Sequence, residues 1–262
     1  MQNRTLAGIL VAAALVAPPL SASATDGASA TAVLSDMQLQ LVDLAPDDGI
    51  APTITFTPGT TFIQAIAGSQ NFYQELPTPF GAGTESVANG QGTASASLAG
   101  DPFAAAATIT TGATVPGAAG PTPDEADAFV FFGETGFTLS PHTEVEITGT
   151  ATVAADVALT PRSRADASVA FNFFSGAGDG RTALTVEANA LPGQDHAGAT
   201  QSLAATFANN TDATLDVLFG AGVTATAVTN AVPEPPTGLL LAIGGAFVLV
   251  SSRRTRAGPR RR

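Results

Sequence analysis

The chain has 262 residues, contains no cysteine and carries a formal net charge of −12. The absence of cysteine excludes disulfides, thiolate metal sites and a cysteine nucleophile. All 22 acidic residues lie between Asp26 and Glu234, where three arginines and no lysine oppose them. A body with so negative a field repels phosphate backbones, so we expect no nucleic acid among its partners.

Residues 1–24 have the parts of a secretory signal peptide. Arg4 supplies a positive start, Leu6–Leu20 form an apolar run that ends in two prolines, and Ala22 and Ala24 match the small-x-small pattern of a cleavage site. The run is short and broken for an uncleaved anchor helix. We therefore expect export by the general secretory route, with the signal removed.

The body, residues 25–231, has no long apolar stripe with a helical period and instead alternates apolar and polar residues, as half-buried strands do. The alternation is clearest in four segments, 143–153, 164–173, 184–187 and 202–207. Residues 81–100 are rich in small residues and are compatible with either a loop or a strand. Strands with one polar face predict an all-β fold, an antiparallel β-sandwich of the jelly-roll-like kind.

The last 31 residues, 232–262, have three parts in a fixed order. A Pro-rich motif at 232–236 is followed by a predicted transmembrane helix at 237–252 and by a basic tail at 253–262. The motif residues are Val232, Pro233, Glu234, Pro235 and Pro236, and the tail opens with Arg253, Arg254 and Arg256. The helix would be about 24 Å long, which is short for a hydrocarbon core of about 30 Å. Bilayer thinning or snorkelling arginine stems can make up the difference, and the arginines place the tail in the cytoplasm.

This tripartite tail resembles the PEP-CTERM sorting signal. The resemblance rests on Pro233, Glu234 and Pro235, on the apolar run Gly238–Val250 and on the arginines from Arg253 onward. It implies a Gram-negative, polysaccharide-producing source and an exosortase as processing partner. It also implies a protein held for a time in the inner membrane, with its body in the periplasm, and then delivered to the cell surface or the extracellular matrix. The alternative is an ordinary tail anchor behind a proline-rich linker.

Catalytic chemistry has little support in the sequence, and we expect a non-enzymatic protein. His142 and His196 belong to no metal-ligand spacing, and no serine-elbow motif is present. Glu144 and Glu146 share one face of a predicted strand about 7 Å apart, a separation compatible with a glycosidase pair. Their neighbours in the pattern face the core, so both glutamates are expected to face water.

Two binding hypotheses remain open for the body. Asp43, Asp47 and Asp48 stand in and before an Asp-Gly turn, where their oxygens could bind calcium. The other candidate ligand is exopolysaccharide. Sugar-binding sandwiches stack sugars on Trp and Tyr rings, and this chain has no tryptophan and only one tyrosine, Tyr73. A concave patch near Tyr73 or near the Asp43–Asp48 turn would favour a binding module over a purely structural protein.

Overall fold

The computed structural model describes residues 27–57, 60–76, 81–101, 103, 107–116, 124–158, 163–175, 178–189, 191 and 193–229. This part of the chain forms β-strands and no helix. In chain order the strands are β1 (Gly27–Asp43), β2 (Ile54–Phe56), β3 (Thr60–Ala67), β4 (Gln70–Leu76), β5 (Gly83–Asn89), β6 (Gly92–Leu98), β7 (Thr108–Pro116), β8 (Asp124–Leu139), β9 (Thr143–Val157), β10 (Arg164–Ser175), β11 (Gly178–Asn189), β12 (His196–Asn209) and β13 (Leu215–Thr229).

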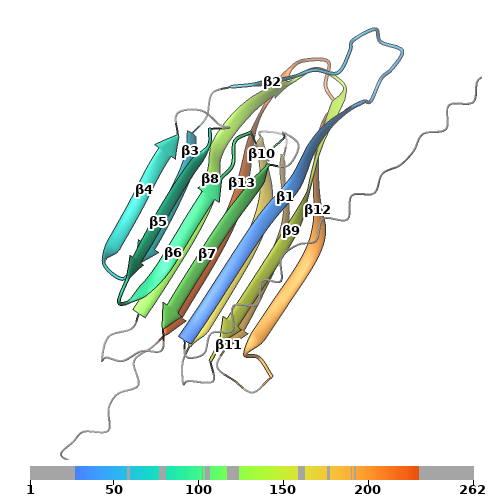
Figure 1. The fold of residues 1–262 in the computed structure, drawn as a ribbon. Helices are drawn as coiled ribbons and strands as arrows, with labels where there is room; N and C mark the ends of the chain where they lie inside the picture. The colour runs from blue at the N-terminus through green and yellow to red at the C-terminus, as the bar shows by residue number, and fades with distance from the viewer. Residues whose placement is uncertain are drawn as a thin grey trace, which may run out of the picture.

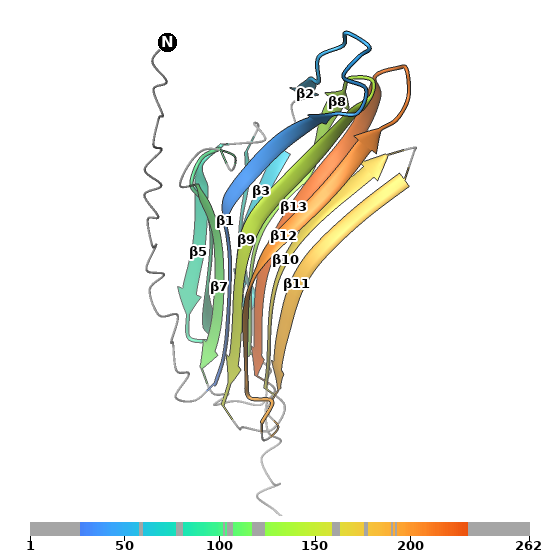
Figure 2. The ribbon, with the colours of Figure 1, turned by 90° about the vertical axis from the view of Figure 1, so that its right-hand side faces the viewer.

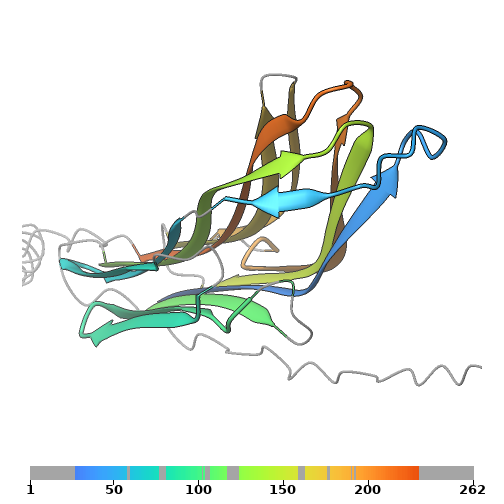
Figure 3. The same ribbon diagram turned by 90° about the horizontal axis from the view of Figure 1, so that it is seen from above.

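These strands form two antiparallel sheets that pack face to face, as Figures 1 and 3 show. The first sheet has the order β12-β9-β1-β7-β6-β5. The second has the order β11-β10-β13-β8-β3-β4, with β2 also paired to β8. Each strand of the first sheet contacts the strand that has the same position in the second sheet. β12 therefore packs on β11 at one edge of the sandwich, and β5 packs on β4 at the other. The predicted all-β antiparallel sandwich is therefore confirmed.

The strand order places the first and the last strand at the centre of the molecule. β1 lies between β7 and β9 in one sheet, and β13 lies between β8 and β10 directly opposite. The described residues make sheets of six and seven strands, in contrast to the eight strands of a jelly roll. Because β1 and β13 each have two sheet neighbours, both ends of the body are fixed by hydrogen bonds on both sides.

The core consists of the inward side chains of both sheets, which alternate with outward polar ones along each strand. In β9, buried and half-buried residues alternate over the whole strand, with Val145 and Ile147 fully buried. In β10 the inward set ends in Phe171 and Phe173, which are also fully buried. The period-two pattern in the sequence thus identified these inward faces correctly.

Residues 81–100, for which the sequence left a loop and a strand open, contain the hairpin of β5 and β6. Ala94, Ala96 and Leu98 point into the core. Thr93, Ser95 and Ser97, which alternate with them, face outward. Small residues form this strand because alanine and serine keep the alternation, although each buries little area.

A β-bulge in β1 changes which residues face the core. Pairing with β9 shifts between Ser35 and Gln38, and Asp36 between them has a left-handed φ of 53°. Before the bulge Leu34 points inward, and within it Met37 does. Bulges bend a strand and strengthen its twist, and the long strands curve toward one end of the sandwich in Figure 2.

The two ends of the sandwich differ. At the terminal end, β1 begins at Gly27 and β13 ends at Thr229, and both residues contact Pro116: Gly27 pairs with it, and the Thr229 hydroxyl donates to its carbonyl at 3.4 Å. At the opposite loop end lie the connections 44–53, 140–142 and 210–214. No helix in the described residues is long and apolar enough to cross a membrane. The predicted transmembrane segment 237–252 lies outside those residues.

Candidate functional site

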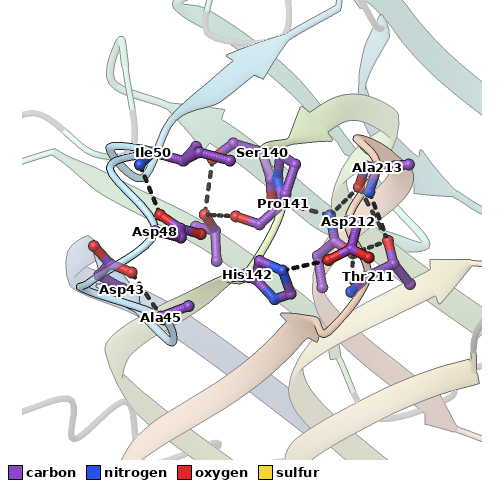
Figure 4. Close-up of polar contacts among 12 residues, drawn as sticks. Asp43, Ala45, Asp48, Ile50, Ser140, Pro141, His142, Thr211, Asp212 and Ala213 are labelled. Carbon is purple, nitrogen blue, oxygen red and sulfur yellow. Dashed lines mark hydrogen bonds and ion pairs between the residues drawn. The ribbon is translucent and has the colours of Figure 1, made fainter.

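A network of hydrogen bonds at the loop end joins three connections that are far apart in the sequence (Figure 4). Asn209, the last residue of β12, is its centre and is fully buried. Its amide nitrogen donates to the carbonyls of Leu139, Ser140 and Ala213 at 3.3, 2.9 and 2.8 Å. Its amide oxygen accepts the backbone N–H of Thr211 at 3.1 Å and the Thr211 hydroxyl at 2.7 Å. One side chain therefore holds the 140–142 and 210–214 connections together.

Hydroxyl groups attach the 44–53 connection to the same network. The Ser140 hydroxyl accepts the N–H of Thr53 at 2.8 Å and lies 2.7 Å from the Thr143 hydroxyl. The Thr143 hydroxyl in turn donates to the carbonyl of Pro141 at 3.0 Å. Such local bonds satisfy backbone groups that the strand ladders no longer pair. The network fixes the shape of the loop end.

The carboxylates proposed for calcium are engaged in local turns. Asp43 accepts the N–H of Ala45 at 2.9 Å, and Asp48 accepts that of Ile50 at 2.6 Å, both as Asx turns. Asp47 is exposed between them. Within the described residues, no group of three or more His, Cys, Asp or Glu side chains could hold a metal ion. The calcium hypothesis gains no support from this geometry.

The two histidines lie at opposite ends of the molecule. His142 has a left-handed φ of 49°, and its Nε2 lies 2.8 Å from Asp212 at the loop end. His196 pairs with Asp156 at the start of β12, toward the terminal end. Each imidazole thus contacts one carboxylate, and the two pairs do not share a site.

Glu144 and Glu146 project outward from β9 and are half-exposed, while Val145 beside them is buried. The orientation predicted from the sequence is therefore correct. Across the sheet the two glutamates lie opposite Ala208 and Thr206 of β12. They sit on the open outer face of the first sheet.

A hollow of about 520 Å³ opens on the outer face of the second sheet near the loop end. Phe174 of β10 and Leu218 of β13 give it an apolar wall and are 45% and 40% exposed. Thr57 and Asp216 add polar atoms. The Cβ of any residue replacing Gly136 would lie 2.4 Å from the Thr57 hydroxyl, so the absence of a side chain there keeps the hollow open. The lining combines apolar rings with hydroxyl and carboxylate oxygens.

An aromatic row lies on the same outer face, across β4, β3 and β8; we define it as Tyr73, Phe62 and Phe131. The rings of Tyr73 and Phe62 stack with centroids 5.8 Å apart and planes at 23°. Phe62 lies directly opposite Phe131 in the strand pairing, so the two share the outer face. Tyr73 is 51% exposed, and the other two rings are half-buried.

Polar side chains surround the aromatic row. The Tyr73 hydroxyl donates to Glu75 at 3.4 Å, and Gln64 donates to Asn71 at 2.9 Å beside it. Partial burial, followed by the charge and hydrogen bond of Glu75, raises the pKa of Tyr73 above its ordinary value. The phenol therefore stays a hydrogen-bond donor at neutral pH.

Sequence reasoning looked for tryptophan and tyrosine and so missed this row, which is mostly phenylalanine. A signal was present at residues 129–132, Phe-Val-Phe-Phe, where Val130 alternates with Phe129 and Phe131. An apolar pattern on both faces of one strand indicates an outward aromatic surface as well as a core.

Several predicted sites fall outside the described residues. They are the signal-cleavage residues Ala22 and Ala24, the sorting motif Val232, Pro233, Glu234 and Pro235, and the basic tail with Arg253, Arg254 and Arg256. These assignments stay predictions.

The fold and surfaces define a β-sandwich protein with a buried polar network at one end and an outward aromatic row on one sheet. No protein-family model matches the chain, and no curated protein matches it. One solved structure that matches the chain weakly is described as "Structural basis for the promiscuous specificity of the carbohydrate-binding modules from the beta-sandwich super family". The two share 9% identity, the match covers 73% of this chain and 95% of that one, and the TM-score is 0.11. A similarity at that TM-score supports no conclusion about fold or ligand.

Proposed function

We propose that the chain is an exported, non-enzymatic surface or extracellular-matrix protein whose C-terminal tail is processed by exosortase. The observation that carries this proposal is where the last described strand ends. That strand, β13, ends at Thr229, so only residues 230 and 231 separate it from Val232 of the motif. Every described strand lies before the motif, and cleavage there would release the sandwich with all of its described pairing.

The placement of the two ends also supports display from a membrane. Gly27 and Thr229 both contact Pro116 at the terminal end. A signal peptide before Gly27 and an anchor after Thr229 would therefore both join the body at its terminal end. In that arrangement the loop end, with its Asn209 network, is the part directed away from the membrane.

The test is the C-terminal mass of the mature protein, purified from one host that has exosortase and from a matched host that lacks it. We expect loss of residues 238–262 in the first host only, and any added mass would identify what the new end is joined to. An intact tail in both hosts would refute sorting and leave a membrane-anchored β-domain.

A second candidate function, polysaccharide binding by the outer face of the second sheet, is favoured by the aromatic row. Sugar rings have apolar faces that stack on aromatic side chains and polar edges that take hydrogen bonds. Tyr73 and Phe62 offer the stacked rings, and Glu75, Gln64 and Asn71 offer the bonds. The acidic body would repel uronate polymers, so the chemistry favours an uncharged polysaccharide.

The binding test compares Tyr73→Ala with Phe72→Ala. Both are exposed aromatic residues of β4, at 51% and 47%, but they lie on opposite faces of the strand. Affinity electrophoresis through neutral dextran, with alginate as the charged counterpart, should show weaker retardation for Tyr73→Ala only. The loss of one stacked ring is worth about 1 kcal/mol, or roughly fivefold in Kd. Equal behaviour of the two variants would remove the aromatic row as the binding surface.

A further inference from the structure

The two sheet orders end in four edge strands, apart from the three-residue β2 that pairs only with β8, and one of the four differs from the others in charge. The edges are β12 and β5 in the first sheet and β11 and β4 in the second. β5 carries Glu85, β4 carries Glu75 and β11 carries Asp179, Arg181 and Glu187. β12 has 14 residues with no Asp, Glu, Lys, Arg or Pro. Charged residues and prolines are the usual means by which edge strands avoid pairing with other chains.

The outward backbone groups of β12 can be identified from its pairing. The N–H of Val157 donates to the carbonyl of Asp195 at 2.9 Å, and from there the pairing of β12 with β9 runs to Asn209 without a register shift. In an antiparallel pair, bonded and non-bonded residues alternate. Odd-numbered residues therefore bond to β9, and even-numbered ones, such as Ser202 and Ala204, direct their N–H and C=O groups away from it. No strand among the described residues takes up these groups.

Two further observations indicate what fits this edge. Leu184 and Val186 of β11 and Ala199 and Phe207 of β12 pack against the core but remain partly exposed along this side. An additional strand here would cover apolar atoms that the sandwich alone leaves in contact with water. The rest of the body is strongly acidic, so two copies repel each other over most of their surfaces. Of the four edges, only β12 adds no carboxylate of its own strand to such a contact.

We propose that β12 pairs antiparallel with β12 of a second copy, joining the first sheets of both molecules into one continuous sheet. In such a pair, the even-numbered residues, whose N–H and C=O groups point away from β9, must lie opposite even-numbered residues of the second copy. Two registers pair most of the strand: one places Ser202 opposite Ser202 of the second copy, and the other places Ser202 opposite Ala204. The interface is isologous, since the same edge is used by both copies. This inference is independent of the sorting and polysaccharide proposals.

The chain contains no cysteine, so introduced thiols report directly on this interface. Bonded residues of an antiparallel pair have Cα atoms about 5.5 Å apart, within the disulfide range of roughly 4.4–6.8 Å. The double variant Ser202→Cys/Ala204→Cys places a thiol opposite a thiol in both registers. The matched control is Thr108→Cys/Thr110→Cys, which has the same spacing on the exposed outer face of β7, an interior strand of the same sheet.

The full chain is purified in mild detergent, oxidised in air and run on non-reducing gels. We expect the β12 variant to shift from the 26.0 kDa chain to twice that mass, and to return on reduction. The control should stay at the single-chain mass. No dimer from the β12 variant, or equal dimer from both variants, would overturn the proposal; equal dimer would mean contact through the tail or random collision.

A second measurement is free of covalent trapping. Sedimentation of the wild-type chain should show a concentration-dependent dimer. In both registers the variant Ser202→Glu/Ala204→Glu places a carboxylate directly opposite a carboxylate of the second copy. The variant should therefore sediment as a monomer. Thr108→Glu/Thr110→Glu adds the same charge away from the edge and should keep the dimer. Identical behaviour of the two glutamate variants would refute pairing through β12.

Discussion

Asn209→Asp is the sharpest test of the loop-end network, because it changes one atom of a fully buried side chain. The amide nitrogen that donates to three carbonyls, at 2.8 to 3.3 Å, becomes an oxygen facing three oxygens. Losing three buried hydrogen bonds at roughly 1 kcal/mol each predicts a cost of about 3 kcal/mol or more. For a domain of this size that lowers Tm by roughly 6–12 °C. Thermal unfolding followed by circular dichroism at pH 7.5 measures it.

The penalty should depend on pH. Burial among carbonyl oxygens raises the pKa of the introduced carboxyl above that in the unfolded chain. The folded variant therefore binds a proton more readily than the unfolded one, and its stability falls as pH rises through the raised pKa. The difference in Tm between the variant and wild type should narrow toward pH 4. The control is Asn210→Asp, the same change at the exposed neighbouring residue. If both variants melt together at pH 7.5, Asn209 does not hold the loops as the structure indicates.

Three further substitutions test packing and charge by urea unfolding. Thr111→Val should stabilise the protein by about 1 kcal/mol, because the buried Thr111 hydroxyl has no hydrogen-bond partner among the described residues and valine has the same shape. Gly149→Ala should destabilise it by roughly 1–3 kcal/mol, since the new Cβ would lie 2.9 Å from a Leu34 methyl. Burial and the neighbouring Asp127 raise the pKa of Glu125, so Glu125→Gln should be more stable than wild type at neutral pH. That gain should vanish below about pH 4, where the glutamate is protonated in both states.

The sandwich could be predicted from the sequence because the information for it is local. Alternation in 164–173 is enough to distinguish the inward Phe171 and Phe173 from their outward neighbours, and the structure confirms both. The bulge at Asp36 and the order of the strands depend on pairings between distant segments, such as β1 with β9. Period-two patterning says which face of a strand is buried but not which strand lies beside it.

The candidate sites were harder to predict for the same reason. Asn209 ends β12, but the three carbonyls that its amide nitrogen binds belong to Leu139 and Ser140, 70 and 69 residues away, and to Ala213, 4 residues away. The aromatic row joins Tyr73 to Phe62 and Phe131 across three strands. A search for tryptophan and tyrosine finds only one of those rings. Composition alone therefore underestimates the aromatic surface that strand pairing assembles.

The β12 interface and the proposed anchor together make a geometric prediction. Antiparallel pairing of identical strands inverts one copy relative to the other, so the terminal ends of a pair point in opposite directions. If residues 237–252 span a bilayer, two neighbours anchored in one membrane stand parallel and cannot pair through β12. Released molecules, or copies anchored on two membranes that face each other, can pair through β12. In vesicles containing the full-length Ser202→Cys/Ala204→Cys variant, disulfide dimers should therefore form only where vesicles cluster, and should not form when the vesicles are diluted before oxidation. Dimers in dilute, unclustered vesicles would contradict either the antiparallel pairing or the anchor, and the detergent experiment separates the two.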